Sequence, residues 1–312
     1  MNGSDTSEIP KIKASLVVEL IVSVAIVIMN IMSVAALSRC VKMDRRISIM
    51  IKNIALADTL LGFCPVNFAI GEQFHLFKIM LWCYFVLIFN RVTVLMKMFS
   101  VSILAVDRFS CLYFSTWYLK YVDKTVTTKV SLIAWTTALG MALATYVRRL
   151  SLRLNCFHEN KTMGFGLMIA LGLLCGTTIL VAYTGVFLNI RKHEKYLKLL
   201  NISTGSSKRT LYRSTIKLCL LMLVFVVCYT PSGLYRTSVY LNPEFQFNTE
   251  TFRHSANVIF LMSSIINPLL YVWRFTECRL KLLEIVFRCN RKKIENLQKR
   301  QRDIFAFNLQ TN

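Results

Sequence analysis

Charged residues are scarce in this sequence. Only 17% of its 312 residues are charged, whereas 55% are apolar, and the mean hydropathy is +0.50. Soluble domains usually carry roughly 25% charged residues. The composition therefore excludes an ordinary soluble protein and indicates a protein that lies in a membrane.

Histidine is rare as well. The four histidines, His75, His158, His193 and His254, lie far apart and do not have the spacing of a metal site. No cluster of titratable residues suggests an active site. We therefore expect no enzyme activity, no metal site and no cofactor.

Acidic residues are few: 16 Asp and Glu stand against 38 Lys and Arg, which gives a formal net charge of +22. A protein this basic could bind nucleic acid. Here, however, most basic residues flank apolar runs and do not form one groove with aromatic platforms. We interpret the charge as membrane topology plus contact with anionic lipids, and predict no nucleic-acid partner.

Seven apolar runs are long enough to cross the hydrocarbon core, which takes about 20 helical residues. Seven spans place the two ends of the chain on opposite sides of the membrane. We expect an all-α membrane protein, a seven-helix bundle. The predicted spans are roughly 15–38, 48–72, 80–112, 126–147, 163–190, 215–240 and 251–273.

The orientation follows from the basic residues, which resist translocation. With the amino end outside, the three cytoplasmic loops (39–48, 113–129 and 191–213) hold 14 Lys or Arg, and outer segments of almost equal total length hold 8. The stretch from Arg274 onward adds 10 more on the cytoplasmic side. We therefore predict a multi-pass plasma-membrane protein with its amino end outside.

The segments that flank the spans suggest modification sites. The sequons at Asn2 and Asn160 fall on the outer side and are candidates for glycosylation. After the seventh span, apolar and basic residues alternate as in an amphipathic helix that lies among lipid headgroups. Cys289, at the end of that helix, is a candidate for palmitoylation. The predicted domains are a short extracellular segment (1–14), a seven-span domain (15–273), and an amphipathic helix with a basic cytoplasmic tail (274–312).

Two opposite charges fall inside the spans at comparable depth. Asp58 lies in the middle of the second span and Lys97 in the middle of the third. A charged group at this depth costs a few kcal/mol unless it is paired. We predict that Asp58 and Lys97 form an ion pair with hydrogen bonds from Asn30, Ser264 or Asn267. The alternative, that Lys97 extends to the membrane surface, is disfavoured because Lys97 lies near the middle of its span and its side chain is too short to reach either surface.

Short motifs occur along the seven spans in a fixed order. They are Asn30, "LAD" with Asp58, Cys83, Asp107-Arg108-Phe109, Trp135, Tyr183, "FVVCYTP" with Phe225, Cys228 and Pro231, and "NPLLY" from Asn267 to Tyr271. With these motifs in this order and at these spacings, the chain resembles a rhodopsin-like (class A) G-protein-coupled receptor over nearly its whole length.

The resemblance implies an extracellular ligand and a heterotrimeric G protein as partners. It implies that Asp107 holds Arg108 at rest and releases it toward two tyrosines when the sixth span swings outward. A multi-pass transporter or channel-like protein is the alternative, although neither broken helices with an inverted repeat nor a polar-lined pore is clear. The residues of the implied switch are Asp107, Arg108, Tyr183, Asn267, Pro268 and Tyr271.

The sixth span is expected to carry the trigger, formed by Phe225, Tyr229 and Pro231. Pro231 removes a backbone donor and bends the helix, as Pro268 does in the seventh span. Tyr229 stands where the family usually has tryptophan, so the trigger is altered. The usual proline of the fifth span is also missing.

The resemblance also bears on Cys83 and on Lys97. Cys83 and Cys156 both face the oxidising compartment, and the resemblance favours a disulfide between them over two free thiols. In the family, the counterpart of Asp58 commonly binds sodium beside a small polar residue at the position of Lys97. We hypothesise that the Lys97 ammonium replaces that ion here.

The polar residues in the outer halves of the spans bear on the class of ligand. Amine receptors have Asp where this chain has Asn90, and no lysine in the seventh span could bind retinal. Four arginines in the outer halves of the spans, Arg91, Arg149, Arg236 and Arg253, would favour a carboxylate or phosphate. The alternatives are that several of them contact headgroups or acidic residues, or that the ligand is a short peptide.

Overall fold

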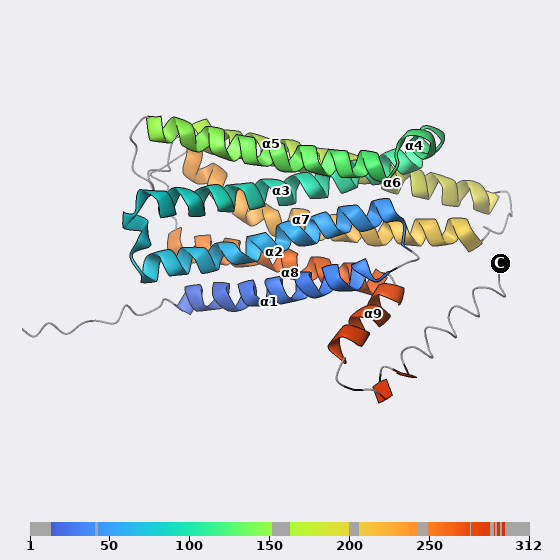
Figure 1. Cartoon of the computed structure of the whole chain (residues 1–312). Coiled ribbons are helices and arrows are strands. Elements are labelled where there is room, and N and C mark those ends of the chain that lie inside the picture. The colour runs from blue at the N-terminus through green and yellow to red at the C-terminus, as the bar shows by residue number, and fades with distance from the viewer. Residues whose placement is uncertain are drawn as a thin grey trace, which may run out of the picture.

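Long helices build the structure (Figure 1). The computed structural model describes residues 14–40, 43–151, 163–199, 206–241, 249–274, 276–287, 290, 292–293 and 295–296. Seven long helices within this part match the predicted spans: α1 (Ala14–Ser38), α2 (Arg45–Gln73), α3 (Met80–Tyr113), α5 (Lys124–Ser151), α6 (Met163–Leu199), α7 (Ser206–Leu241) and α8 (Thr249–Arg274).

In the described part of the chain, short helices mark the two ends of the bundle. The 3-10 helix η1 (Leu76–Lys78) connects α2 to α3 at the end that we call the outer end. Helices α4 (Ser115–Tyr121) and α9 (Thr276–Val286) lie at the opposite, inner end (Figure 1). The names follow the predicted orientation, in which the inner end faces the cytoplasm.

The outside of the bundle is apolar, as a bilayer requires. Large side chains such as Ile133, Leu173 and Val181 are exposed, a pattern that marks contact with lipid in a protein of this composition. Among the described residues, five helices are long and apolar enough to span a membrane by themselves, and α7 and α8 run beside them in the same bundle (Figure 1). The five spans are Leu16–Ser38, Arg45–Gln73, Met80–Tyr113, Lys124–Val147 and Gly166–Asn189.

The interior contains separate apolar clusters with polar residues between them. The inner cluster joins α2, α3, α6 and α7 through residues such as Ile54, Leu104, Ile179 and Phe225. Between the helices, the Trp135 indole nitrogen donates to Asn53 Oδ1 at 2.7 Å, and Asn53 Nδ2 donates to Ser100 Oγ at 3.0 Å. These bonds fix α2, α3 and α5 in one register at the level of the site.

Helix α9 leaves the bundle beside the inner end of α1 (Figure 1). It is amphipathic, because Cys278 and Leu280 are buried whereas Arg279 between them is exposed. Lys281 and Glu284 form an ion pair of 3.0 Å on this helix. The predicted amphipathic helix is thus present, bounded by Thr276 and Val286.

Candidate functional site

A fully buried ion pair lies at the centre of the bundle. Lys97 Nζ of α3 lies 3.0 Å from Asp58 Oδ1 of α2, and both side chains are 0% exposed. The ammonium also donates to Ser263 Oγ and Ser264 Oγ of α8. Since an ammonium has three donors, these three oxygens satisfy it. The structure thus brings together the two charges that the sequence placed at one depth.

Two further donors satisfy the carboxylate. Ser264 Oγ donates to Asp58 Oδ1 and Asn267 Nδ2 donates to Asp58 Oδ2, each at 2.8 Å. Asn30 acts one step away, because its Nδ2 donates to the Ser264 carbonyl at 3.0 Å. Ser263 was not among the residues expected from the sequence, although its place next to Ser264 in the same span was a usable signal.

At the inner end, Asp107 binds two partners with its two oxygens. Oδ2 accepts from the guanidinium of Arg108, a residue only 6% exposed. Oδ1 accepts from the Tyr118 hydroxyl at 2.7 Å. Both described hydrogen bonds of the Arg108 guanidinium go to Asp107, the arrangement expected of a resting switch.

Tyr118 was not expected from the sequence. This residue lies on α4 and is almost fully buried. The Arg46 guanidinium of α2 covers its ring at 4.9 Å, and Arg46 Nη1 donates to the Val122 carbonyl at 3.0 Å. Burial, and then the hydrogen bond to Asp107, raises the pKa of Tyr118. The phenol therefore stays protonated and remains a donor.

The remaining switch residues are distributed between α6 and α8. Tyr183 packs against the inner apolar cluster. Asn267 contacts Asp58, as described above, and α8 continues through Pro268. The backbone of Tyr271 belongs to α8, but its side chain lies outside the described part.

Above the ion pair, the expected trigger residues form a chain of aromatic contacts. Phe225 and Tyr229 of α7 stack with ring centroids 5.6 Å apart, and Tyr229 meets the edge of Phe260 at the same distance. The Lys97 ammonium lies 5.0 Å from the centre of the Phe260 ring. Contact therefore runs from α7 to the buried charge through three rings, and α7 itself continues through Pro231.

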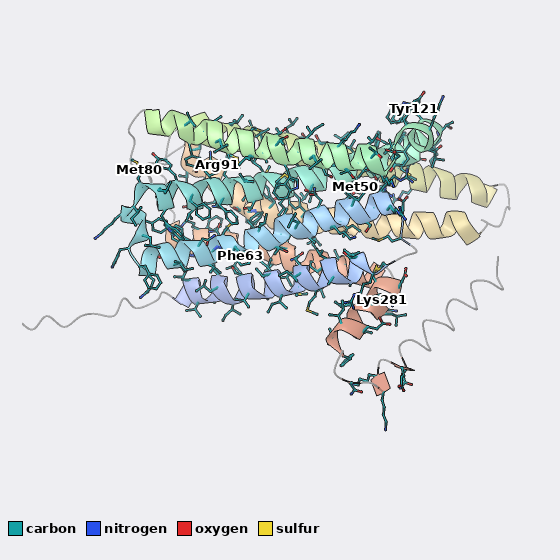
Figure 2. The ribbon with its side chains drawn as sticks, viewed as in Figure 1. Met50, Phe63, Met80, Arg91, Tyr121 and Lys281 are labelled. Carbon is teal, nitrogen blue, oxygen red and sulfur yellow. A yellow bond between two sulfur atoms is a disulfide. The ribbon has the colours of Figure 1, made fainter. Side chains whose placement is uncertain are left out.

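A cavity of about 300 Å³ lies among α3, α5, α6 and α7, with Phe225 and Tyr229 in its lining. Asn90, Arg91 and Arg236 line it, and Tyr229 forms part of its wall. Figure 2 labels Arg91 on α3, toward the Met80 end. The Arg91 guanidinium lies 5.4 Å from the centre of the Tyr146 ring, a cation–π contact that orients it.

The structure brings only part of the predicted arginine set to this cavity. Arg253 of α8 is not among the described residues that line it, and its Nη2 lies 3.4 Å from His254 Nε2. His254 Nδ1 in turn lies 2.7 Å from Glu19 Oε1 of α1. Arg149 belongs to α5, but its side chain lies outside the described part.

The family assignment comes from comparison with known proteins. The sequence model of the family "7 transmembrane receptor (rhodopsin family)" matches residues 29–271. The chain belongs to this family. It is therefore a multi-pass membrane protein, and its fold and non-enzymatic class agree with the sequence predictions.

A more distant similarity links this rhodopsin-family chain to melanocortin receptor 5 of Homo sapiens. The two are 21% identical over 197 residues, which make up 62% of this chain and 58% of that receptor. The match thus spans less than two thirds of the relative's length. It supports the family and does not by itself assign a ligand.

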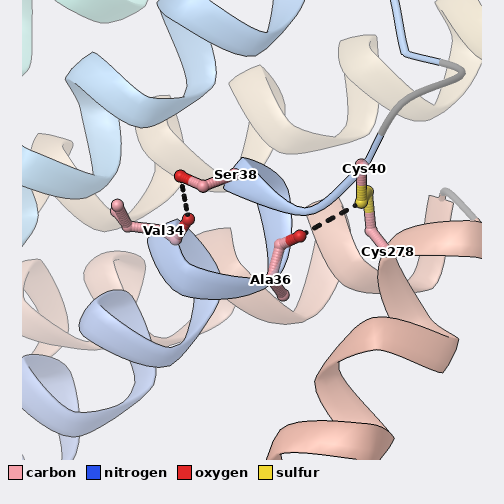
Figure 3. The surroundings of a disulfide bond; sticks show 5 residues. All are labelled: Val34, Ala36, Ser38, Cys40 and Cys278. Carbon is pink, nitrogen blue, oxygen red and sulfur yellow. Dashed lines mark hydrogen bonds between the residues drawn. A yellow bond between two sulfur atoms is a disulfide. The ribbon is translucent and has the colours of Figure 1, made fainter.

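The inner end of this family member contains a disulfide that the sequence did not predict. Cys40, just after α1, is bonded to Cys278 of α9, and their Cα atoms lie 5.7 Å apart (Figure 3). The two residues are 238 positions apart in the sequence, and nothing in their local sequences links them. The bond joins α9 covalently to α1.

Several predicted modification sites lie outside the described residues. Cys83, at the outer start of α3, is buried and disulfide-bonded. Its predicted partner Cys156 is outside the described part, so the pairing stays a prediction. The same holds for glycosylation at Asn2 and Asn160 and for palmitoylation at Cys289.

Proposed function

We propose that this protein is a receptor that converts binding of an extracellular anionic ligand into activation of a heterotrimeric G protein. Membership of the rhodopsin family supports the receptor role. The proposed ligand class and G-protein coupling depend on one observation. Helices α3 and α7 connect a cavity lined by two arginines to the Asp107–Arg108 contact at the inner end.

The ligand site of this proposal is the cavity between α3, α5, α6 and α7. Its volume of about 300 Å³ suits a small molecule better than a peptide. Arg91 and Arg236 supply planar donors that bind a carboxylate or phosphate in a bidentate manner. Asn90, on the same wall, supplies a neutral polar contact.

The response in this proposal travels through the ring of Tyr229. This ring belongs to the cavity wall, stacks on Phe225 and meets Phe260. A ligand that displaces Tyr229 would therefore disturb the packing of α7 against α3 and α8. Outward movement of α7 would then expose Arg108 to the G protein.

At the inner end, the proposed activation step exchanges the partners of Arg108. Its guanidinium leaves Asp107 for the hydroxyls of Tyr183 and Tyr271 and for backbone carbonyls of the G protein. Tyr118 opposes this step, because its hydroxyl binds the other oxygen of Asp107 and holds that carboxylate in the resting position. Because Arg108 is almost fully buried at rest, its release requires the helices to separate.

The central ion pair is proposed to make the receptor independent of sodium. All three donors of the Lys97 ammonium have oxygen partners, and both oxygens of Asp58 accept hydrogen bonds. A sodium ion at Asp58 would have to displace a covalently attached cation.

The test of the proposed function is nucleotide exchange. The full-length receptor, reconstituted in lipid nanodiscs with a panel of purified G proteins, should accelerate GDP release when a ligand binds. Arg108→Ala should abolish that acceleration and leave ligand binding within a fewfold of the wild-type value. An unchanged exchange rate in Arg108→Ala would exclude the proposed switch.

A further inference from the structure

The ligand cavity is open on the side where α6 and α7 face the membrane. Glycines line this side: Gly172 and Gly176 on α6, and Gly233 on α7. A Cβ atom added at Gly172 would lie 3.2 Å from the Tyr229 hydroxyl oxygen, and one added at Gly233 would first meet the Tyr229 ring of its own helix at 3.6 Å, whereas one added at Gly176 would meet no other heavy atom within 4 Å. The missing side chain at Gly176 therefore leaves a gap on this side of the cavity.

The gap is limited to the middle of the membrane. Toward the outer end, a Cβ atom at Gly166 of α6 would lie 2.9 Å from the Tyr240 hydroxyl oxygen of α7, so the two helices are in close contact there. Gly176 lies ten residues further along the span that begins at Gly166, which is about 15 Å at 1.5 Å per residue. That depth is about half of the ~30 Å hydrocarbon core.

The rim of this gap faces hydrocarbon. Leu173, Leu180 and Leu234 line the cavity and are nevertheless 64%, 54% and 64% exposed. In a membrane-spanning helix, an exposed leucine at this depth contacts acyl chains. The cavity is thus continuous with the lipid phase at its side.

Inside the cavity, the charge is entirely positive. Arg91 and Arg236 belong to the lining, and none of the described lining residues is acidic. The rest of the lining is mainly apolar, with threonines and tyrosines among its neutral polar members. Such a site combines an anion-binding part with an apolar path that leads into the bilayer.

We propose that the ligand is a single-chain amphiphile with a carboxylate or phosphate head, which binds with its head at Arg91 and Arg236 and its acyl chain in the gap between α6 and α7. The proposal rests on the proposed function only in taking this cavity as the ligand site. It explains why the lining combines arginines with a glycine at Gly176, since the missing side chain there leaves room for a chain that the cavity cannot hold by itself.

Direct binding provides the test, with the full chain in phosphatidylcholine nanodiscs. The probes are straight-chain fatty acids of increasing length, lysophosphatidic acid as the phosphate counterpart, and fatty alcohols, which lack the charge. Acetate and inorganic phosphate serve as anions without a chain. Wild-type affinity for the acids, referred to their aqueous concentration, should rise by up to roughly fourfold per added CH₂ group.

Gly176→Phe fills the gap and provides the critical variant. It should weaken binding of long-chain acids at least tenfold and leave that of acetate unchanged. Gly140→Phe is the matched control, because a Cβ atom added at Gly140 of α5 would also meet nothing within 4 Å, yet Gly140 does not line the cavity. Arg236→Gln, at an exposed position, should remove the preference for acids over alcohols without the risk of overpacking.

Each outcome separates this inference from the proposed function. Chain-dependent binding that Gly176→Phe removes and Gly140→Phe preserves supports the inference, even if nucleotide exchange does not respond, in which case the proposed function fails alone. Equal binding of long-chain acids by the wild type and Gly176→Phe overturns it. Acetate or phosphate that binds as tightly as the long-chain acids and activates the receptor also overturns it and leaves the proposed function standing. The lysophosphatidic acid arm decides between the two head groups.

Discussion

Neutralising Lys97 alone should destabilise the receptor more than removing the entire Asp58–Lys97 pair. In Lys97→Met, Asp58 keeps its hydrogen bonds from Ser264 and Asn267 but loses the counter-ion at 3.0 Å. The double variant Asp58→Asn/Lys97→Met leaves no buried charge. It should therefore recover most of the lost stability.

The magnitude follows from the geometry. Two unit charges 3.0 Å apart attract by about 5–6 kcal/mol at an effective dielectric constant of about 20. Desolvation of both groups offsets most of this gain, whereas an uncompensated buried charge costs about 3–5 kcal/mol. At about 2–4 °C per kcal/mol, the single variant should melt roughly 10 °C below the wild type.

Thermal unfolding of the purified receptor in detergent provides the assay. The wild type, Lys97→Met, Asp58→Asn and the double variant should be measured in sodium chloride and in choline chloride at equal ionic strength. The wild type should melt at the same temperature in both salts. Lys97→Ser should gain a stabilisation by sodium that the further change Asp58→Asn removes.

Two results would refute this reasoning. If Lys97→Met melts at the wild-type temperature while the double variant melts lower, the pair is not electrostatically coupled as its geometry indicates. If sodium changes the melting temperature or ligand affinity of the wild type, and Asp58→Asn removes that effect, the ammonium does not replace the ion.

Three further predictions concern the two ends of the bundle. Tyr118→Phe removes one hydrogen bond worth about 1 kcal/mol from the resting contact, so basal nucleotide exchange should rise about fivefold; no rise, or a rise that Arg108→Ala does not suppress, would contradict this role. Without reductant, alkylation and peptide mass spectrometry should find Cys40 and Cys278 protected, with both labelled after reduction; labelling before reduction would argue against the bond. Peptide N-glycosidase should shift the mobility of the wild type more than that of Asn160→Gln, and equal shifts would show that this sequon is unused.

The sequence predicted the bundle well because hydropathy reports the membrane directly. It located the ends of α6 and α7 less well: the predicted spans 163–190 and 215–240 became Met163–Leu199 and Ser206–Leu241. Both helices continue at their inner ends through polar residues. Backbone hydrogen bonds hold a helix together beyond the hydrocarbon layer, where hydropathy carries no signal. For the same reason, a seven-residue helix such as α4 was not predicted.

Within the site, the sequence could predict the Asp58–Lys97 ion pair, because it follows from depth in the membrane alone. Each of the two charges needs a partner inside the hydrocarbon layer, and each is the nearest opposite charge at the other's depth. It could not predict that Tyr118 reaches Asp107, because that contact depends on how a loop helix packs under the bundle. Nor could it predict the gap at Gly176, which depends on the rotation of α6 relative to α7.

The bond between Cys40 and Cys278 has a mechanical consequence for the inner face. The covalent crosslink fixes α9 to the inner end of α1, and the two helices cannot separate there unless the disulfide is reduced. Any enlargement of the cytoplasmic mouth must then come from helices away from this corner, such as the inner ends of α6 and α7, which do not pack against α9 within the described residues. The α1–α9 corner would stay in place while other helices move, and the bend in the moving helices would lie away from the amphipathic helix.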